Sequence, residues 1–170
     1  TYTGTAHTAT GTATGVLSEA LSGLDLSGTT HTNAGDYPAD AWSFSGGTNY
    51  NDASGTVHDV IDKATATIHI TPYSGVYDGH SHSLTGTATG VVGEDLSAGL
   101  NFGASFTDVP GGTATWTFNG GTNYNNDTGT AAVTITKATP TVTATGGTFT
   151  YDTTLHAGSG SATGVLSEVL

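Results

Sequence analysis

Residues 113–118 read Thr113-Ala114-Thr115-Trp116-Thr117-Phe118. The apolar residues of this run fall on every second position, and threonines occupy the positions between them. Alternation with a period of two is typical of a β-strand that has one face in a core and the other in water. The run therefore predicts an antiparallel strand whose inner face carries Trp116 and Phe118.

This strand pattern occurs twice in the chain. Trp42 and Phe44 precede Trp116 and Phe118 by 74 residues, and the sequence Gly-Gly-Thr-Asn-Tyr-Asn follows soon after each pair. Self-similarity at a fixed spacing indicates an array of like units, and units of this length are small domains rather than solenoid repeats. Further recurring positions are Tyr2 and Tyr77, His7 and His82, Gly15 and Gly90, Leu21 and Leu96, Tyr50 and Tyr124, Gly55 and Gly129, and Lys63 and Lys137. A third copy begins with Tyr151, His156, Gly164 and Leu170.

Lys-Ala pairs mark the ends of the units. Residues 65–138 make one complete unit, residues 1–64 lack the opening strand, and residues 139–170 hold only the first half of a third unit. Gly-Gly and Asp-Gly turns separate the alternating runs. We therefore predict an all-β chain, a linear array of small antiparallel β-sandwich domains.

Three more runs predict strands by the same alternation. Their predicted inward residues are Ile68 and Ile70, Val133 and Ile135, and Val142 and Ala144. Helical spacing occurs only in residues 16–26, where Gly15, Gly23 and Gly28 limit its length. One short helix or a turn remains open there.

Several of these motifs resemble the bacterial MBG repeat, a glycine-rich and mostly β family with Ig-like relatives. They are Tyr77-Asp78-Gly79 with His82, Thr87-Ala88-Thr89-Gly90-Val91, Gly121-Thr122-Asn123-Tyr124-Asn125 and Ile135-Thr136-Lys137-Ala138. The run Thr32-Asn33-Ala34-Gly35-Asp36-Tyr37 is similar to a turn shared with bacterial Ig-like domains. The resemblance implies a long bacterial extracellular or cell-surface protein with stalk or adhesive roles, and it implies no catalytic residues.

Charge and composition exclude several classes of function. The formal net charge is −12, which disfavours nucleic acid and anionic membranes as partners. The chain has no Cys, so disulfides and zinc thiolate sites are excluded. No run approaches the roughly 20 apolar residues of a membrane helix, so no membrane insertion is expected within this window. The absence of Met suggests that the sequence begins inside a longer polypeptide.

No enzyme motif is present. The chain lacks a nucleophile elbow, a phosphate loop and a HExxH motif, and it has no Arg and only two Lys. We therefore expect a protein that is not an enzyme and that has no cofactor, with calcium as the one candidate ligand.

The candidate calcium ligands are amide and carboxylate side chains in the two Gly-Gly loops. Alternating oxygen ligands in a tight loop can bind Ca²⁺, although no bidentate Glu closes either loop. Asn and Asp also stabilise turns by bonding to their own backbone, and this is the favoured alternative. The candidates are Asn49, Asn51, Asp52, Asn123, Asn125 and Asp127.

The recurrent His and Lys residues invite a functional and a structural interpretation. His7, His82 and His156 occupy one position of the repeat, and His80 adds a second ring for a metal, but packing beside a hairpin Tyr is favoured. Lys63 and Lys137 end strands and could form isopeptide bonds, but a role at the joint between units is favoured. Asn126-Asp127-Thr128 fits a glycosylation sequon.

The ends of the sequence are out of phase with the units. The sequence is either an arbitrary segment of a long array, or the surplus strand at 139–150 completes the first unit of another copy by strand donation. Residues 151–170 match residues 2–21 more closely than the middle copy does, most clearly in Val-Leu-Ser-Glu. The partners expected are therefore neighbouring repeats or further copies of the chain.

The function expected first is structural: a stalk or extracellular filament built from tandem repeats, which could also be adhesive. The alternative is a module that binds glycans, with Trp42, Trp116, Tyr50 and Tyr124 as stacking platforms if their rings are exposed.

Overall fold

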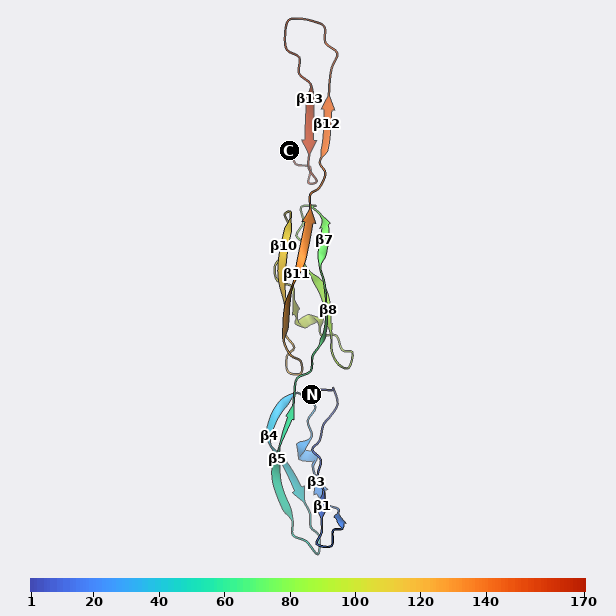
Figure 1. The fold of residues 1–170 in the computed structure, drawn as a ribbon, viewed down its shortest axis with the longest axis vertical. Helices are drawn as coiled ribbons and strands as arrows, with labels where there is room; N and C mark the ends of the chain where they lie inside the picture. Colours follow the sequence, from blue (N-terminus) through green and yellow to red (C-terminus); the bar gives the residue numbers. More distant parts are fainter. The chain divides into compact units, whose positions relative to one another are not determined.

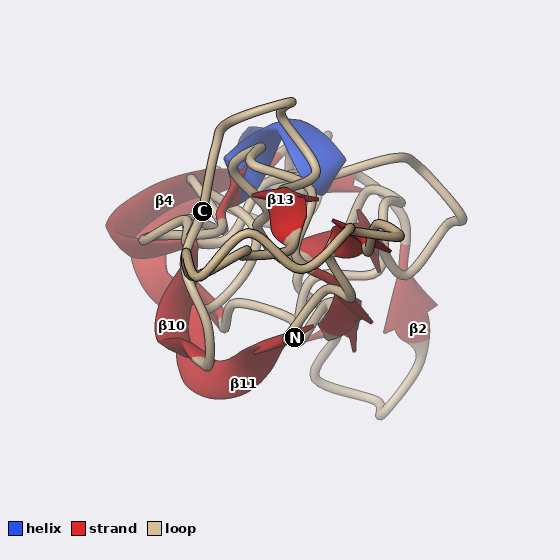
Figure 2. Cartoon of the chain, turned by 90° about the horizontal axis from the view of Figure 1, so that it is seen from above, coloured by secondary structure: helices blue, strands red, loops and turns tan.

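The computed structural model describes residues 1–170, and its regular elements are β-strands and two short 3-10 helices, η1 (Ser27–Thr29) and η2 (Ser97–Gly99). Figure 2 shows how little of the chain is helical. The all-β prediction is therefore confirmed. The strands are β1 (Ala13–Thr14), β2 (Ala20–Leu21), β3 (Leu24–Asp25), β4 (Gly35–Phe44), β5 (Ala53–Ile61), β6 (Thr67–Thr71), β7 (Tyr73–Val76), β8 (Thr85–Thr89), β9 (Leu100–Asn101), β10 (Gly111–Phe118), β11 (Asp127–Thr136), β12 (Thr141–Thr145) and β13 (Ser159–Thr163).

The first repeat is built on a three-stranded antiparallel sheet with the order β3-β4-β5. β4 and β5 form the long hairpin visible in Figure 1, in which Trp42 lies opposite Gly55. The register shifts between Tyr37 and Asp40. β1 and β2 make a separate two-stranded pair. β5 is therefore an edge strand, and its outer side has no neighbouring strand in this sheet.

The second repeat contains a four-stranded sheet with the order β7-β11-β10-β9 and a separate pair, β6-β8. β7 runs parallel to β11, with Tyr73 opposite Val133 and Val76 opposite Thr136. The prediction of purely antiparallel strands is therefore wrong at this pair. Alternation of side chains reports which face of a strand is buried, but it carries no information about the direction of the neighbouring strand.

The core of the second repeat lies between residues that the alternation predicted to face inward. Leu84, Ala114 and Val133 form a buried cluster, and Trp116 packs against it. Phe118 and Ile135 are buried as well, which confirms the inward faces of β10 and β11. Gly129 lies beneath the indole of Trp116, where a Cβ atom would come within 2.7 Å of the ring. The arrangement of these sheets as a sandwich stays a prediction.

The sequence leaves one local feature open and predicts another incorrectly. Residues 16–26 form turns and the short strands β2 and β3, so the turn is the alternative that is present, and Ser18 adopts a positive φ of 64° within it. The prediction for Val142 is wrong. β12 and β13 pair as an isolated hairpin, and Val142, predicted to face inward, is 67% exposed. Alternation marks an apolar face, but a face is buried only where a second layer covers it.

The chain folds into two compact units, each assembled from several segments of the sequence. The first unit comprises residues 1–69, 87–100 and 118–127, and the second comprises residues 70–86, 101–117 and 128–170. The boundaries between sequence repeats, predicted at 64/65 and 138/139, stay predictions. The chain has no helix that is long and apolar enough to span a membrane.

Candidate functional site

The candidate site lies in the first of the two compact units. There, the end of the first sequence repeat contacts the Gly-Gly loop of the second repeat. Ala64 forms a parallel bridge with Tyr124. The Ala64 backbone N–H donates to the Asn123 carbonyl at 2.9 Å, and the Asn125 N–H donates to the Ala64 carbonyl at 2.8 Å. Ala64 and Tyr124 are each only 3% exposed. We call this arrangement the joint, and its central contact consists of main-chain hydrogen bonds.

Side chains extend the joint on both sides of this bridge. The Asn123 amide oxygen accepts a hydrogen bond from the Ala34 N–H at 2.9 Å, and its Nδ2 donates to the Asn33 side-chain oxygen at 3.1 Å. Lys63 Nζ donates to the Gly121 carbonyl at 2.6 Å. The contacts of Lys63 therefore support its predicted role at a joint between two repeats.

A tyrosine closes the joint. The Tyr124 ring meets the edge of the Tyr2 ring with their centroids 5.5 Å apart. Its hydroxyl donates to the Glu94 carboxylate and accepts the Val91 N–H at 2.9 Å. We call this Tyr–Glu pair the clamp. Gly90 lies against the clamp so closely that a Cβ atom there would collide with Glu94 and the Tyr124 hydroxyl, so a larger residue would displace the clamp.

The first repeat contains the same clamp. Tyr50 donates to the Glu19 carboxylate and accepts the Val16 N–H at 3.3 Å. The Leu17 N–H donates to Glu19 Oε2 at 2.8 Å, as the Val92 N–H does to Glu94 at 3.1 Å. The clamp is therefore a property of the repeat, and it ties the Gly-Gly loop to a turn about 30 residues earlier.

The clamp perturbs the pKa values of both partners. The hydrogen bond from Tyr124 stabilises the ionised carboxylate and lowers the pKa of Glu94 below its usual 4.5. The bond from Tyr50 lowers the pKa of Glu19 in the same way. Burial and the bond to Glu94 raise the pKa of Tyr124. Both carboxylates are therefore charged acceptors at neutral pH.

These pKa directions predict a loss of stability in acid. A carboxyl group with a lowered folded-state pKa stabilises the fold above its unfolded pKa, and this contribution is lost as the pH falls below about 4.5. We expect the melting temperature of Glu94→Gln to fall less than that of the wild type between pH 5 and pH 3. Tyr124→Phe, which removes the donor, should reduce the pH dependence similarly. Comparing each variant with the wild type at every pH cancels the general effect of net charge, and parallel curves would contradict the role of the clamp.

The candidate calcium ligands lie in or directly after these loops, and two of them, Asp52 and Asn123, already accept backbone hydrogen bonds through a side-chain oxygen. Asp52 accepts the Gly46 N–H at 2.8 Å. In the second repeat the equivalent bond, from the Gly120 N–H at 2.9 Å, goes to Asn126, which was not among the candidates. Asp127 begins β11. No group of three or more His, Cys, Asp and Glu side chains in residues 1–170 is placed to hold a metal. Binding of calcium through Asn49, Asn51, Asp52, Asn123, Asn125 and Asp127 stays a prediction.

The recurrent histidines pack against aromatic rings and carboxylates. His82 stacks on Tyr73 at 4.0 Å, and its Nε2 lies 2.9 Å from Asp78. His156 stacks on Phe149 at 4.4 Å. His80 is exposed and also lies near Asp78. The favoured packing role is therefore what the contacts show, although the stacked ring of His82 belongs to Tyr73 and not to the hairpin Tyr77.

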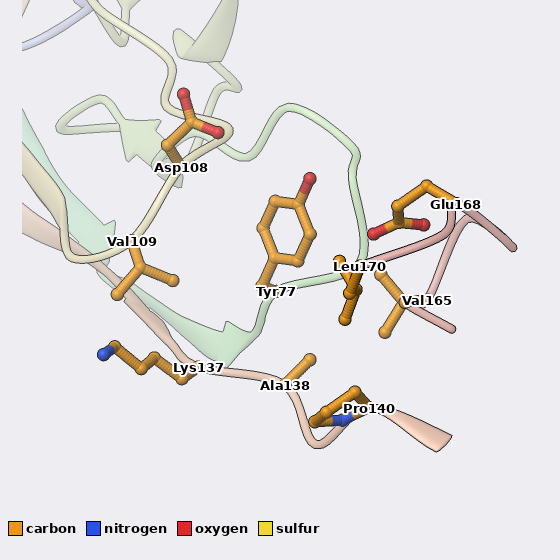
Figure 3. Close-up of a pocket in the computed structure, with 10 residues that line it drawn as sticks. Tyr77, Asp108, Val109, Lys137, Ala138, Pro140, Val165, Glu168 and Leu170 are labelled. Atoms are coloured by element: carbon orange, nitrogen blue, oxygen red, sulfur yellow. The ribbon is translucent and has the colours of Figure 1, made fainter. Parts of the chain in front are cut away.

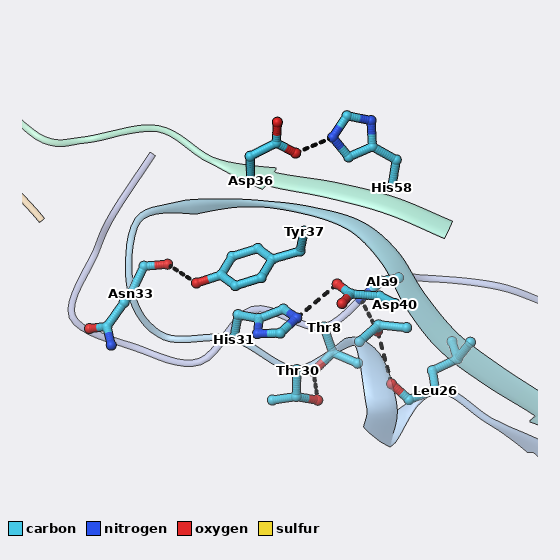
Figure 4. A network of polar contacts seen from close by, with 11 residues as sticks. Thr8, Ala9, Leu26, Thr30, His31, Asn33, Asp36, Tyr37, Asp40 and His58 are labelled. Atoms are coloured by element: carbon cyan, nitrogen blue, oxygen red, sulfur yellow. Dashed lines mark hydrogen bonds and ion pairs between the residues drawn. The ribbon is translucent and has the colours of Figure 1, made fainter. Parts of the chain in front are cut away.

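In the first repeat, no ring stacks on His7, which bonds to Thr3 at 2.8 Å. His31 instead stacks on Tyr37 at 3.5 Å and contacts Asp40 at 2.8 Å. Figure 4 shows His31 between these two residues, and the separate pair of Asp36 and His58 on the other side of the strand.

The predicted aromatic platforms are all at least half-buried and are engaged by neighbouring groups. Tyr50 and Tyr124 are held in the clamps. Trp42 and Trp116 are half-buried and lie over Gly55 and Gly129.

Three residues of the joint and the clamps, Glu19, Glu94 and Ala64, were not predicted from the sequence to be functional. Their signal was present, because Glu recurs four residues after Gly15 and Gly90, and Ala follows Lys in both units.

Comparisons with known proteins identified no relative: no protein family, no curated protein and no solved structure matches the chain. The resemblance to MBG repeats therefore stays a prediction.

Proposed function

We propose that the chain is a structural segment of a long bacterial protein, in which tandem β-repeats build an extracellular stalk or filament. The joint is the observation that carries this proposal. It connects the end of one repeat to the loop of the next by paired backbone hydrogen bonds around a buried Ala64. A contact that depends on the backbone and on recurring residues can be repeated along an array.

Composition supports the same role. Only 9% of residues are charged, the net charge is −12, and Thr, Ser and Gly supply most of the remaining polarity. Such a surface remains hydrated while like charges discourage lateral association. The sandwich arrangement, the absence of enzymatic activity and the extracellular location belong to this proposal.

Binding of glycans, with an adhesive role, is the second candidate. Stacking on a sugar requires an aromatic ring with an exposed face. The four aromatic residues predicted for this role are buried or half-buried, and two of them donate to carboxylates. These observations favour the structural role.

Electron microscopy of the native assembly tests the proposal. We expect fibres or stalks with a regular axial repeat. Small-angle scattering of the 170-residue chain should give a radius of gyration well above the roughly 15 Å of a compact globule of this length. Isolated compact particles, together with a compact radius, would overturn the structural role.

A further inference from the structure

The four-stranded sheet of the second repeat holds its first and last strands next to each other. Along the chain, β7 is the first strand of this sheet and β11 is the last, and the two are neighbours in it. They run parallel, and four residue pairs connect residues 73–76 with residues 133–136. We call these two segments together the parallel pair. All of its residues lie within the second compact unit.

The direction of pairing decides how tension acts on the parallel pair. When the chain is stretched, tension reaches β7 at its first residue, Tyr73, and reaches β11 at its last residue, Thr136. In a parallel pair these two residues lie at opposite ends, so tension draws one strand past the other along their common axis. If the two strands were antiparallel, both residues would lie at the same end, and tension would open the hydrogen bonds one after another. The parallel pair is therefore loaded in shear, and its hydrogen bonds share the tension.

Two further hydrogen bonds reinforce the end of the pair at which tension reaches β11. The Tyr77 N–H donates to the Thr136 carbonyl at 2.8 Å, and the Thr136 hydroxyl donates to the Gly75 carbonyl at 3.2 Å. Figure 3 shows this end of the pair, where Tyr77 follows β7 and Lys137 follows β11. Tension that arrives through Lys137 therefore meets these bonds first.

Side chains on the inner face of the parallel pair also resist sliding. Val133 and Ile135 on β11 are each 1% exposed. Tyr73 on β7 packs against the buried cluster that contains Val133, and its ring stacks on His82 with the centroids 4.0 Å apart. Sliding β7 along β11 would draw the Tyr73 ring away from the core and expose apolar surface to water. The hydrogen bonds and the core contacts of the pair therefore have to yield together.

The first repeat contains the same bond at the end of its last long strand. Tyr2 is the counterpart of Tyr77, and Asp62, directly before the Lys-Ala pair, is the counterpart of Thr136. The Tyr2 N–H donates to the Asp62 carbonyl at 2.8 Å, as the Tyr77 N–H does to Thr136. The bond from the recurring tyrosine to the residue before Lys-Ala is therefore a feature of the repeat.

We propose that the parallel pair is the mechanical element of the second repeat and sets the force at which this repeat unfolds when the chain is stretched. Its hydrogen bonds break together, and the chain between the two strands extends only after they have broken. The proposal rests on the proposed structural function, because a stalk or filament carries tension along its chain. It adds to that function a resistance that depends on the direction of pulling and that is assigned to four residue pairs.

Force spectroscopy of single molecules of the 170-residue chain tests the proposal in two pulling geometries. The chain contains no Cys, so two introduced thiols can attach the handles of an optical trap at chosen residues. Thr71→Cys with Thr139→Cys pulls on the start of β7 and the end of β11, which is the shear geometry. Val76→Cys with Thr139→Cys pulls on the neighbouring ends of the two strands and opens their pairs in turn, which is the matched control. All three positions are exposed.

We expect the unfolding force in the shear geometry to be at least about twofold higher than in the control geometry, because several hydrogen bonds must break together rather than in turn. An increase in extension on the order of 200 Å, at about 3.5 Å per residue, identifies unfolding of the chain between the handles. Without force, the two variants should melt at similar temperatures by circular dichroism, because the substitutions are at exposed positions. The difference in force then reflects the direction of pulling alone.

Equal unfolding forces in the two geometries, or a higher force in the control geometry, would overturn the role of the parallel pair. If native fibres were still seen by microscopy, the structural function would stand and only this assignment of its mechanical element would fail. Compact native particles would instead remove the structural function itself, and with it the tension that the parallel pair is proposed to resist.

Discussion

Leu84→Ala should lower the free energy of unfolding of the second repeat by about 3 kcal/mol, within the usual range of roughly 2–5 kcal/mol for a buried leucine. Leu84 is 1% exposed and lies at the centre of the cluster with Ala114 and Val133. Aromatic rings surround this cluster and cannot collapse into the space that the truncated side chain leaves. A repeat of this size has little stability in reserve, so the loss is a large fraction of the total.

Urea unfolding followed by Trp fluorescence measures this effect. A Trp42→Phe background leaves Trp116, which packs on the cluster, as the only indole. Leu155→Ala is the matched control, since Leu155 is 103% exposed and its truncation removes no buried contact. We expect a change of less than about 0.5 kcal/mol for that control. Similar losses for the two variants would show that Leu84 is not in the core.

The residues that form this core could be predicted only in part. Ala114, Trp116, Val133 and Ile135 alternate with threonines on strands that have one dry and one wet face, so the sequence pattern reports their burial directly. Leu84 continues the alternation of β8, where threonines lie between Leu84, Gly86 and Ala88, but Gly86 interrupts the apolar face, and the burial of Leu84 depends on strands that are distant in the sequence. Periodicity therefore identifies strand faces better than it identifies the residues that close a core.

Sequence patterns also fail to predict which strands become neighbours and which faces a second layer covers. Thr141–Thr145 alternates as cleanly as β10, yet Val142 is exposed because no second layer lies over the hairpin. β7 pairs in parallel, which no local pattern encodes. Both features depend on which distant segment is available as a neighbour, and a local sequence pattern does not specify that segment.

The joint was located by its sequence pattern, but its chemistry was not. The recurring Lys-Ala pairs and Asn-Tyr-Asn loops are repeat features, and the sequence pattern of the loops favours turns, with calcium binding as the alternative. In the structure, the amide of Asn123 bonds to Asn33 and Ala34, about 90 residues earlier. Asn side chains suit either role, and only the position of the distant partner distinguishes them.

Trypsin should cleave the folded chain after Lys137 about 30-fold faster than after Lys63. These are the only basic residues, and each precedes an Ala, so the two sites are chemically matched. At Lys63 the following Ala64 uses both its N–H and its carbonyl in the joint. Opening two net hydrogen bonds of about 1 kcal/mol each gives roughly that ratio, since cleavage follows the population of the open form. At Lys137 the corresponding Ala138 is half-exposed and lines an open cavity.

Ala64→Leu tests whether the joint is the cause of this protection. The larger side chain cannot fit at a position that is 3% exposed between Tyr124 and the end of β5, and overpacking costs about 1–3 kcal/mol. Cleavage after Lys63 should then rise by about 10-fold or more. Ala138→Leu makes the same change of the residue after Lys where space is available, and it should leave both rates unchanged. Equal initial rates at the two lysines in the wild type would mean that the repeats are not held together at Ala64, because both the Ala64 backbone bonds and the bond from Lys63 Nζ to the Gly121 carbonyl should protect the first site.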